Sequence, residues 1–174
     1  KLYCSHKACL VVSSHGCVWH PPSTGINPRR LEPNQLWQTD VTHVPEFGKL
    51  RYVHVSIDTN SHLISACAIP GESTQYVIKH LLLTFAFMGW PTKIKTDNGP
   101  AYASSQFQQF CHTWNIQHST GIPYSSQGQA IVERVHSTLK NMLKKQKRGN
   151  MTMDPATLLA QALFTLNFLN LDKF

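Results

Sequence analysis

The sequence predicts an α/β fold in which a five-stranded mixed sheet is flanked by helices. Two observations lead to this prediction. Three consecutive segments with strand periodicity open the domain, and strand-like and helix-like segments alternate after them. The chain has 174 residues, of which 41% are hydrophobic. One compact domain with an appendage fits that length and that apolar content.

Three strands are expected first, because apolar and polar residues alternate there and β-branched side chains are frequent. These strands span residues 36–44, 52–59 and 63–69. The short segments between them, 46–49 and 60–62, contain the residue types that favour turns. The three strands are therefore expected to form an antiparallel meander.

The rest of the domain alternates between helix and strand patterns. A helix that Ser73 or Thr74 can cap is expected to run to about Met88. Gly89 is expected to end it. The later elements are expected to be a strand at 92–96, a helix at 104–114, a strand at 116–119, and helices at 130–147 and 155–169. This order of strands and helices is the connectivity of the ribonuclease H-like fold.

The charge balance points to an anionic partner. Lys and Arg outnumber Asp and Glu by 16 to 9, which gives a formal charge of +7 and a pI near 9.3. Nucleic acid is the first candidate, and a solvated basic surface is the alternative. No apolar run reaches the roughly 18 residues of a membrane span, and the first residues lack the pattern of a signal peptide. The chain is therefore not expected to be secreted.

The chain divides into regions of different composition. The first region carries three Cys and three His residues, and metal binding explains them better than disulfides do. The next is a Pro-, Gly- and Arg-rich stretch that is typical of a linker. The expected organisation is a Cys/His region at 1–25, a linker at 26–35, the α/β domain at 36–170 and the start of a further region at 171–174.

Three carboxylates lie in contexts that suit metal binding. Asp40 lies within a predicted core strand, where a charge is costly unless it is paired or metal-bound. Asp97 ends another strand, and Glu133 lies early in a basic helix, 35 residues further on. Carboxylates from three elements can meet and hold two Mg²⁺ ions roughly 3.5–4 Å apart, an arrangement that clamps the reacting oxygens of a phosphoryl transfer.

Each of these carboxylates also has a plain structural interpretation. Asp40 could be a buried side chain satisfied by neighbouring Thr or His donors, and Asp97 opens an Asp-Asn-Gly sequence that is common in turns. Asp58 is a rival to Asp40 because it too ends a strand. Asp40 is preferred, since Asp58 precedes a turn, where Asp is frequent for capping reasons.

The sequence blocks around the three carboxylates closely resemble those of retroviral integrase catalytic cores. The blocks are WQTDVTH at 37–43, KTDNGP at 95–100 and GIPYSSQGQAIVER at 121–134. Their order and the 35-residue gap match the D,D(35)E pattern of that family. The sequence most resembles the betaretroviral branch of the family. It resembles either a betaretroviral or an endogenous retroviral integrase. The match covers about residues 26–170.

The resemblance implies a catalytic role for Asp40, Asp97 and Glu133, with two Mg²⁺ or Mn²⁺ ions as cofactor. It implies that the protein processes the 3′ ends of viral DNA and joins them to host DNA by phosphodiester transfer. Viral and host DNA would then be its partners, together with further copies of itself in a homodimer or larger oligomer. Host nucleus and virion would be its locations, and the sequence does not indicate a host cofactor.

The resemblance also implies contacts to DNA. Tyr124 and Gln129 would touch the viral DNA end from the loop before the last catalytic block. Lys140 lies seven residues after Glu133 and so shares its helix face; with Lys144 it belongs to a basic stripe that suits phosphate contact. Asn98, beside the second Asp, is included among the expected DNA-binding residues. His43 is expected to support the site without a catalytic role.

A zinc site is expected only in incomplete form. Integrases carry an amino-terminal His-His-Cys-Cys domain whose last ligands form Cys-x-x-Cys before the linker. Here Cys17-Val18-Trp19-His20 stands in that place, so Cys17 and His20 are the candidate zinc ligands. Residues 1–25 would be a remnant of that domain.

Other functions share parts of this pattern. A retrotransposon integrase or a DDE transposase would have the same triad with different contacts to the DNA ends. A catalytically inactive module that binds DNA or dimerises is the non-enzyme alternative, and the intact triad argues against it. Ribonuclease H itself fits less well, because it uses an additional carboxylate and lacks the 35-residue spacing.

Overall fold

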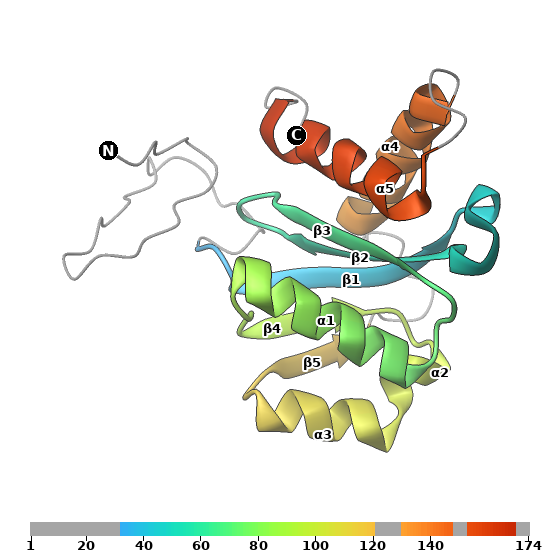
Figure 1. Cartoon of the computed structure of the whole chain (residues 1–174). Coiled ribbons are helices and arrows are strands. Elements are labelled where there is room, and N and C mark those ends of the chain that lie inside the picture. Colours follow the sequence, from blue (N-terminus) through green and yellow to red (C-terminus); the bar gives the residue numbers. More distant parts are fainter. Residues whose placement is uncertain (1–31, 121–129, 148–152, 170–174) are drawn as a thin grey trace.

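The computed structural model describes residues 32–120, 130–147 and 153–169 (Figure 1). These residues form three layers. A sheet lies in the middle, helices α4 and α5 cover one face, and helices α1 to α3 pack on the other (Figure 1). The expected amino-terminal regions 1–25 and 26–31 and the end of the chain lie outside the described residues.

The sheet is the predicted one. Its strands are β1 (Leu36–His43), β2 (Tyr52–Asp58), β3 (Ile64–Ile69), β4 (Lys93–Thr96) and β5 (Gln117–Thr120), in the order β3-β2-β1-β4-β5. β1, β2 and β3 form an antiparallel meander, and β4 and β5 run parallel to β1. The mixed five-stranded sheet and its meander are thereby confirmed.

The helices also follow the predicted order. They are α1 (Thr74–Met88), α2 (Pro100–Ala103), α3 (Ser105–Thr113), α4 (Ala130–Lys147) and α5 (Pro155–Phe164), with helical turns η1 (Pro45–Leu50) and η3 (Thr165–Leu169). Gly89 ends α1 with a φ of +78°, a conformation that glycine adopts without steric cost. Asp154 caps α5 by accepting hydrogen bonds from the backbone N–H groups of Ala156 and Thr157. None of the described helices has the length and hydropathy needed to cross a bilayer.

Two local predictions were wrong, and one short helix was missed. The expected turn at 46–49 is part of the 3-10 segment η1, because Phe47 is buried in the core and holds the turn against the domain. The short helix α2 was not expected. The last helix was expected to be continuous to residue 169, but it widens into a π-helical turn at η3. That turn brings Asn167 onto strand β3, where its side chain bonds both backbone groups of Ile64, at 2.9 and 2.8 Å.

Two apolar cores fill the two sides of the sheet, because the side chains of a strand alternate between its faces. On β2, Val53, Val55 and Ile57 pack under α4 and α5 with Val135 and Leu139. On the other face, one cluster joins α1 and α3; its largest members are Trp37, Leu81, Phe85, Ile94 and Phe107.

A buried polar layer lies between the sheet and α1. His80 on α1 is fully buried, and its Nε2 is 2.8 Å from the Ser56 hydroxyl on β2. Ser56 in turn is 2.9 Å from the hydroxyl of Thr39 on β1, and the His80 Nδ1 is 3.1 Å from Sγ of Cys67 on β3. Burial lowers the pKa of His80 to about 3, with a smaller contribution from His54, so its ring is neutral at neutral pH.

Candidate active site

Asp40 lies on the central strand β1 and faces α4. Its Oδ1 accepts a hydrogen bond of 2.8 Å from the backbone N–H of Val41, and a fifth of its side chain is exposed. The pKa of Asp40 is raised to about 6, chiefly by burial. The charges of Asp97 and Glu133 raise it further, against the lowering effect of the Val41 hydrogen bond. The three predicted catalytic carboxylates therefore lie close enough to interact electrostatically.

Asp97 follows directly after β4, the strand parallel to β1. The register pairs Gln38 with Lys95, so two residues further along each strand Asp40 and Asp97 come side by side. The carboxylate of Asp97 accepts a hydrogen bond of 3.0 Å from the backbone N–H of Gly99. A Cβ at Gly99 would lie 2.9 Å from that same carboxylate oxygen, so a larger residue there would displace the Asp97 side chain. The turn interpretation of Asp97 and its place beside Asp40 are thus compatible.

Glu133 lies exposed in the first turn of α4. The start of this helix is anchored to β1 by a buried hydrogen bond in which the Val132 backbone N–H donates to Oε1 of Gln38, at 3.1 Å. Gln38 is two residues before Asp40 and therefore on the same face of the strand. Gln38 was not among the predicted site residues, although its two-residue spacing from Asp40 is visible in the sequence.

A second missed residue is His136, one turn after Glu133. Its Nδ1 lies 3.8 Å from Oδ2 of Asp40, and its Nε2 is buried without a hydrogen-bond partner among the described residues. Burial and the charge of Lys140 lower the pKa of His136 to about 4. Its spacing of three residues from Glu133 places both side chains on neighbouring positions of one helix face, and this was the available signal.

Asp40 and Asp97 line an open hollow of about 670 Å³ at the end of β1. His43 and Glu72 form its rim, with a distance of 3.7 Å between His43 Nε2 and Glu72 Oε2. Tyr102 lies in its floor; burial and the nearby carboxylates raise its pKa, and its hydroxyl has no partner within the described part of the chain. Among the described residues, no three His, Cys, Asp or Glu side chains are gathered closely enough to form a metal cluster.

The rival Asp58 has a structural task. It accepts hydrogen bonds from the backbone N–H and the hydroxyl of Ser61, at 3.1 and 2.6 Å, and so caps the turn between β2 and β3. Its side chain lies on the opposite face of the sheet from Asp40, because β2 alternates in the same way as β1. The preference for Asp40 over Asp58 is consistent with this geometry.

The predicted DNA-binding residues fall into two groups. Lys140 and Lys144 lie on α4, Lys140 half-buried near His136 and Lys144 exposed, and Asn98 is exposed beside Asp97. Tyr124 and Gln129 lie outside the described residues, as do the candidate zinc ligands Cys17 and His20.

Comparison with known proteins places the chain in a family. A family model described as "Integrase core domain" matches residues 30–126, which include Asp40 and Asp97. The chain is 56% identical over 153 residues to the Gag-Pro-Pol polyprotein of Sheep pulmonary adenomatosis virus, a match that covers 87% of this chain and 9% of that polyprotein. It is 54% identical over 159 residues to the Pol-related polyprotein of Mouse intracisternal a-particle MIA14, covering 90% of this chain and 18% of that protein.

A solved structure agrees with the sequence relatives. The catalytic core domain of HTLV-2 integrase, in complex with magnesium and in a dimeric form, has a TM-score of 0.73 and 36% identity to this chain. The match covers 82% of this chain and 92% of that one. The sheet order and the carboxylate hollow define a ribonuclease H-like domain. The chain belongs to the integrase core domain family, and the predicted likeness to betaretroviral or endogenous retroviral integrases is confirmed by these Pol relatives.

Proposed function

We propose that this chain is the catalytic core of an integrase that trims the 3′ ends of viral DNA and joins them to host DNA by Mg²⁺-dependent phosphodiester transfer. The observation that carries the proposal is that Asp40 and Asp97 line one hollow, while the charges of Asp97 and Glu133 add to the effect of burial on the pKa of Asp40. The family supports the same activity, and the polyprotein relatives supply the viral context.

The residues present fit a divalent cation. The donor set is made of carboxylate oxygens, which Mg²⁺ prefers. Burial chiefly raises the pKa of Asp40, and the charges of Asp97 and Glu133 add repulsion that a cation would relieve. Asp40, Asp97 and Glu133 would hold the ions. When bound, such ions lower the pKa of a water molecule and neutralise charge on a phosphate. Magnesium is present in the related HTLV-2 core, and Mn²⁺ is the second candidate.

The protein's own part is to position these groups. Gln38 ties the start of α4 to β1, which sets the distance from Glu133 to Asp40. The Asp97–Gly99 turn fixes the second carboxylate. Phosphodiester transfer needs aligned oxygens and neutralised charge more than covalent help, so rigid placement of these side chains is the main catalytic requirement.

DNA would lie across the carboxylate hollow and along α4. Lys140 and Lys144 would contact phosphates, because both project from the helix that carries Glu133. Asn98 is exposed beside Asp97 and would reach the same strand. Tyr124 and Gln129 would hold the viral end.

A second copy of the chain is the proposed protein partner. Monomeric proteins rarely expose a large contiguous apolar surface. Here α1 and the residue after its cap expose Leu82, Leu83, Phe87 and Trp90, between 43% and 59%, and the end of the last helix exposes Phe164, Phe168 and Leu169. The dimeric form of the HTLV-2 core supports the same assignment.

Place of action and zinc binding follow from the family assignment. The protein would enter cells in the virion and act in the host nucleus, where its target DNA lies. Residues 1–25 would be a remnant of a zinc domain in which Cys17 and His20 are ligands, and residues 26–35 its linker to the core.

The function is tested with duplex oligonucleotides that carry candidate viral ends, a plasmid target and Mg²⁺. Joined products that depend on the end sequence and disappear in Asp40→Asn are expected. Nicking without joining would instead indicate a nuclease, and joining of transposon-type ends alone would favour a DDE transposase. Equal product from the Asp40→Asn variant would reject the proposed site.

A further inference from the structure

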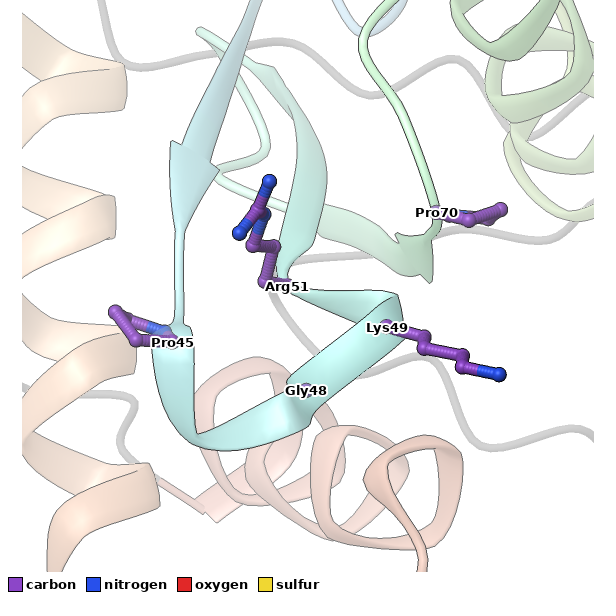
Figure 2. A pocket seen from close by; sticks show the side chains of 5 residues that line it. All are labelled: Pro45, Gly48, Lys49, Arg51 and Pro70. Carbon is purple, nitrogen blue, oxygen red and sulfur yellow. The ribbon is translucent and has the colours of Figure 1, made fainter.

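A second hollow, of about 690 Å³, lies on the turn between β1 and β2. It is lined by Pro45, Gly48, Lys49, Arg51 and Pro70 (Figure 2). Figure 2 shows Lys49 on η1 and Arg51 at its C-cap with their side chains pointing in different directions, and Pro70 directly after the end of β3. The family assignment and the proposed site give this hollow no task.

The hollow carries positive charge that carboxylates do not neutralise. Lys49 and Arg51 are both exposed, and within residues 32–120, 130–147 and 153–169 neither lies within 4 Å of a carboxylate. Arg51 is nevertheless held in place, since its guanidinium lies 5.2 Å over the Tyr52 ring and donates to the Tyr52 hydroxyl at 3.3 Å. A guanidinium and an ammonium group on the lining of one hollow favour an anion with several acceptor oxygens.

This basic hollow adjoins the carboxylate hollow. His43 lines the carboxylate hollow and Pro45, two residues on, lines the basic one. In the same way Glu72 lines the first and Pro70 the second. Beside them the ring of His43 meets the ring of Tyr52 edge-on, with centroids 4.9 Å apart.

We propose that the basic hollow is a phosphate subsite for the DNA strand that crosses the carboxylate hollow, with Lys49 and Arg51 as its ligands. The inference rests on the proposed function for the identity of the polyanion. Each strand of a duplex carries one phosphate per roughly 3.4 Å of axis. A strand with a phosphate beside Asp40 therefore also presents phosphates beyond the rim that His43 and Glu72 form. The subsite fixes the direction in which that strand leaves the carboxylates.

An acidic protein segment is the competing ligand. The hollow is open and shallow, and the residues that line it include no aromatic side chain, the type of anchor on which protein interfaces depend. A row of phosphates needs only cations on the surface, and Lys49 and Arg51 supply them.

The test is a salt titration of duplex DNA binding, measured by fluorescence anisotropy without divalent ions. Lys49→Gln and Arg51→Gln should each reduce the slope of log K against log salt by about 0.9. Between 50 and 200 mM salt, each variant should therefore lose about 3.5-fold less affinity than the wild-type chain does. Arg51→Lys keeps the charge and should keep most of the slope.

The matched control is Lys79→Gln, which removes an equally exposed charge from α1, outside the residues that line both hollows. It should leave the slope unchanged. Slopes of Lys49→Gln and Arg51→Gln equal to that of Lys79→Gln would overturn the inference. Loss of binding to a poly-glutamate peptide with intact DNA binding would overturn it in favour of a protein partner.

The proposed function is tested separately in the same preparations by nicking in Mg²⁺. Absence of nicking by the wild-type chain would count against the function and not against the subsite, because the titration is made without metal. Normal nicking by wild type together with unchanged slopes in the two variants would reject the subsite and leave the function standing.

Discussion

His136 on α4 lies with its Nδ1 3.8 Å from Oδ2 of Asp40 on β1, one helical turn after Glu133. At neutral pH this is not an ion pair, because burial and Lys140 lower the pKa of His136 to about 4. The neutral ring lies beside the carboxylate, and Gln38 holds the start of the same helix. Helix α4 therefore supplies Glu133 and also brings His136 next to Asp40.

We predict that Asp40→Asn stabilises the metal-free protein at pH 7. The pKa of Asp40 is about 6 in the folded chain and 3.8 ordinarily, so the folded state retains a proton that the unfolded state loses as pH rises from about 4 to about 6. The wild-type chain loses stability across that window, by an amount on the order of 1–3 kcal/mol. Urea unfolding at pH 4 and pH 7 measures it, with exposed Glu46→Gln as the control. An unchanged pH dependence in Asp40→Asn would contradict the prediction.

The same substitution should abolish activity. Asp40→Asn, Asp97→Asn and Glu133→Gln are each expected to remove Mg²⁺-dependent phosphodiester cleavage, because an amide oxygen is a weaker ligand for the cation than a carboxylate. Circular dichroism should show an intact fold. Any of the three variants that cleaves at close to the wild-type rate would lose its residue from the proposed site.

His80 should make the protein sensitive to acid. Its pKa is about 3 in the folded chain and 6.5 ordinarily, so below pH 6.5 the unfolded state binds a proton that the folded state excludes. Stability should fall by about 1.4 kcal/mol per pH unit from this residue, or about 2 kcal/mol between pH 6.5 and pH 5. His80→Gln should flatten that dependence, and exposed His112→Gln should not. Equal slopes for the two variants would assign the acid sensitivity elsewhere.

Lys140→Glu should weaken DNA binding and reduce its dependence on salt. Each lost phosphate contact lowers the slope of log K against log salt by about 0.9, and the reversed charge adds repulsion. The comparison is Lys79→Glu on α1, which makes the same charge change away from the site. Identical affinities for the two variants would mean that Lys140 is a solvated side chain.

Gln129→Ala should separate DNA positioning from metal binding. We expect unchanged Mg²⁺ affinity and a loss of strand transfer on the order of a hundredfold, because an error of about 1 Å in the position of a nucleophile has an effect of that size. Tyr124→Ala should behave alike. If Mg²⁺ affinity and strand transfer both persist, the segment with Tyr124 and Gln129 only connects two elements. If both are lost together, that segment supports the structure of the triad.

Leu83→Glu should dissociate the proposed dimer. Leu83 is 56% exposed on α1 and belongs to neither apolar core of the described residues, so the monomer should remain folded. Sedimentation velocity would show a monomer for this variant and a dimer for Gln109→Glu, an exposed control on α3. A dimer for both variants would move the interface away from α1.

The strands and the three carboxylates could be predicted because both leave periodic or spaced signals in the sequence. Asp40 stands out as a charge in an apolar strand, and α4 carries Glu133 at a fixed distance from Asp97. The supports of the site could not be predicted in the same way. Gln38 and His136 acquire their roles only when α4 packs against β1. The local sequence does not indicate where that helix packs.

The missed local structures have similar causes. Gly48 and Lys49 are typical of a turn, but Phe47 beside them is buried. The burial of Phe47 outweighed turn propensity in the formation of η1. The π-helical widening at the end of the chain depends on a contact with β3 that lies 103 positions away in sequence. Such long-range contacts leave no periodicity to detect.

That contact has a consequence for how the molecule avoids aggregation. β3 is an edge strand, and an edge with free backbone groups invites pairing with a strand of another molecule. The Asn167 amide occupies both the N–H and the C=O of Ile64, as a neighbouring strand would. The first residue of the edge is thereby closed to strand addition, and sheet-to-sheet growth of misassembled copies would have to begin further along β3 or at the four-residue edge strand β5.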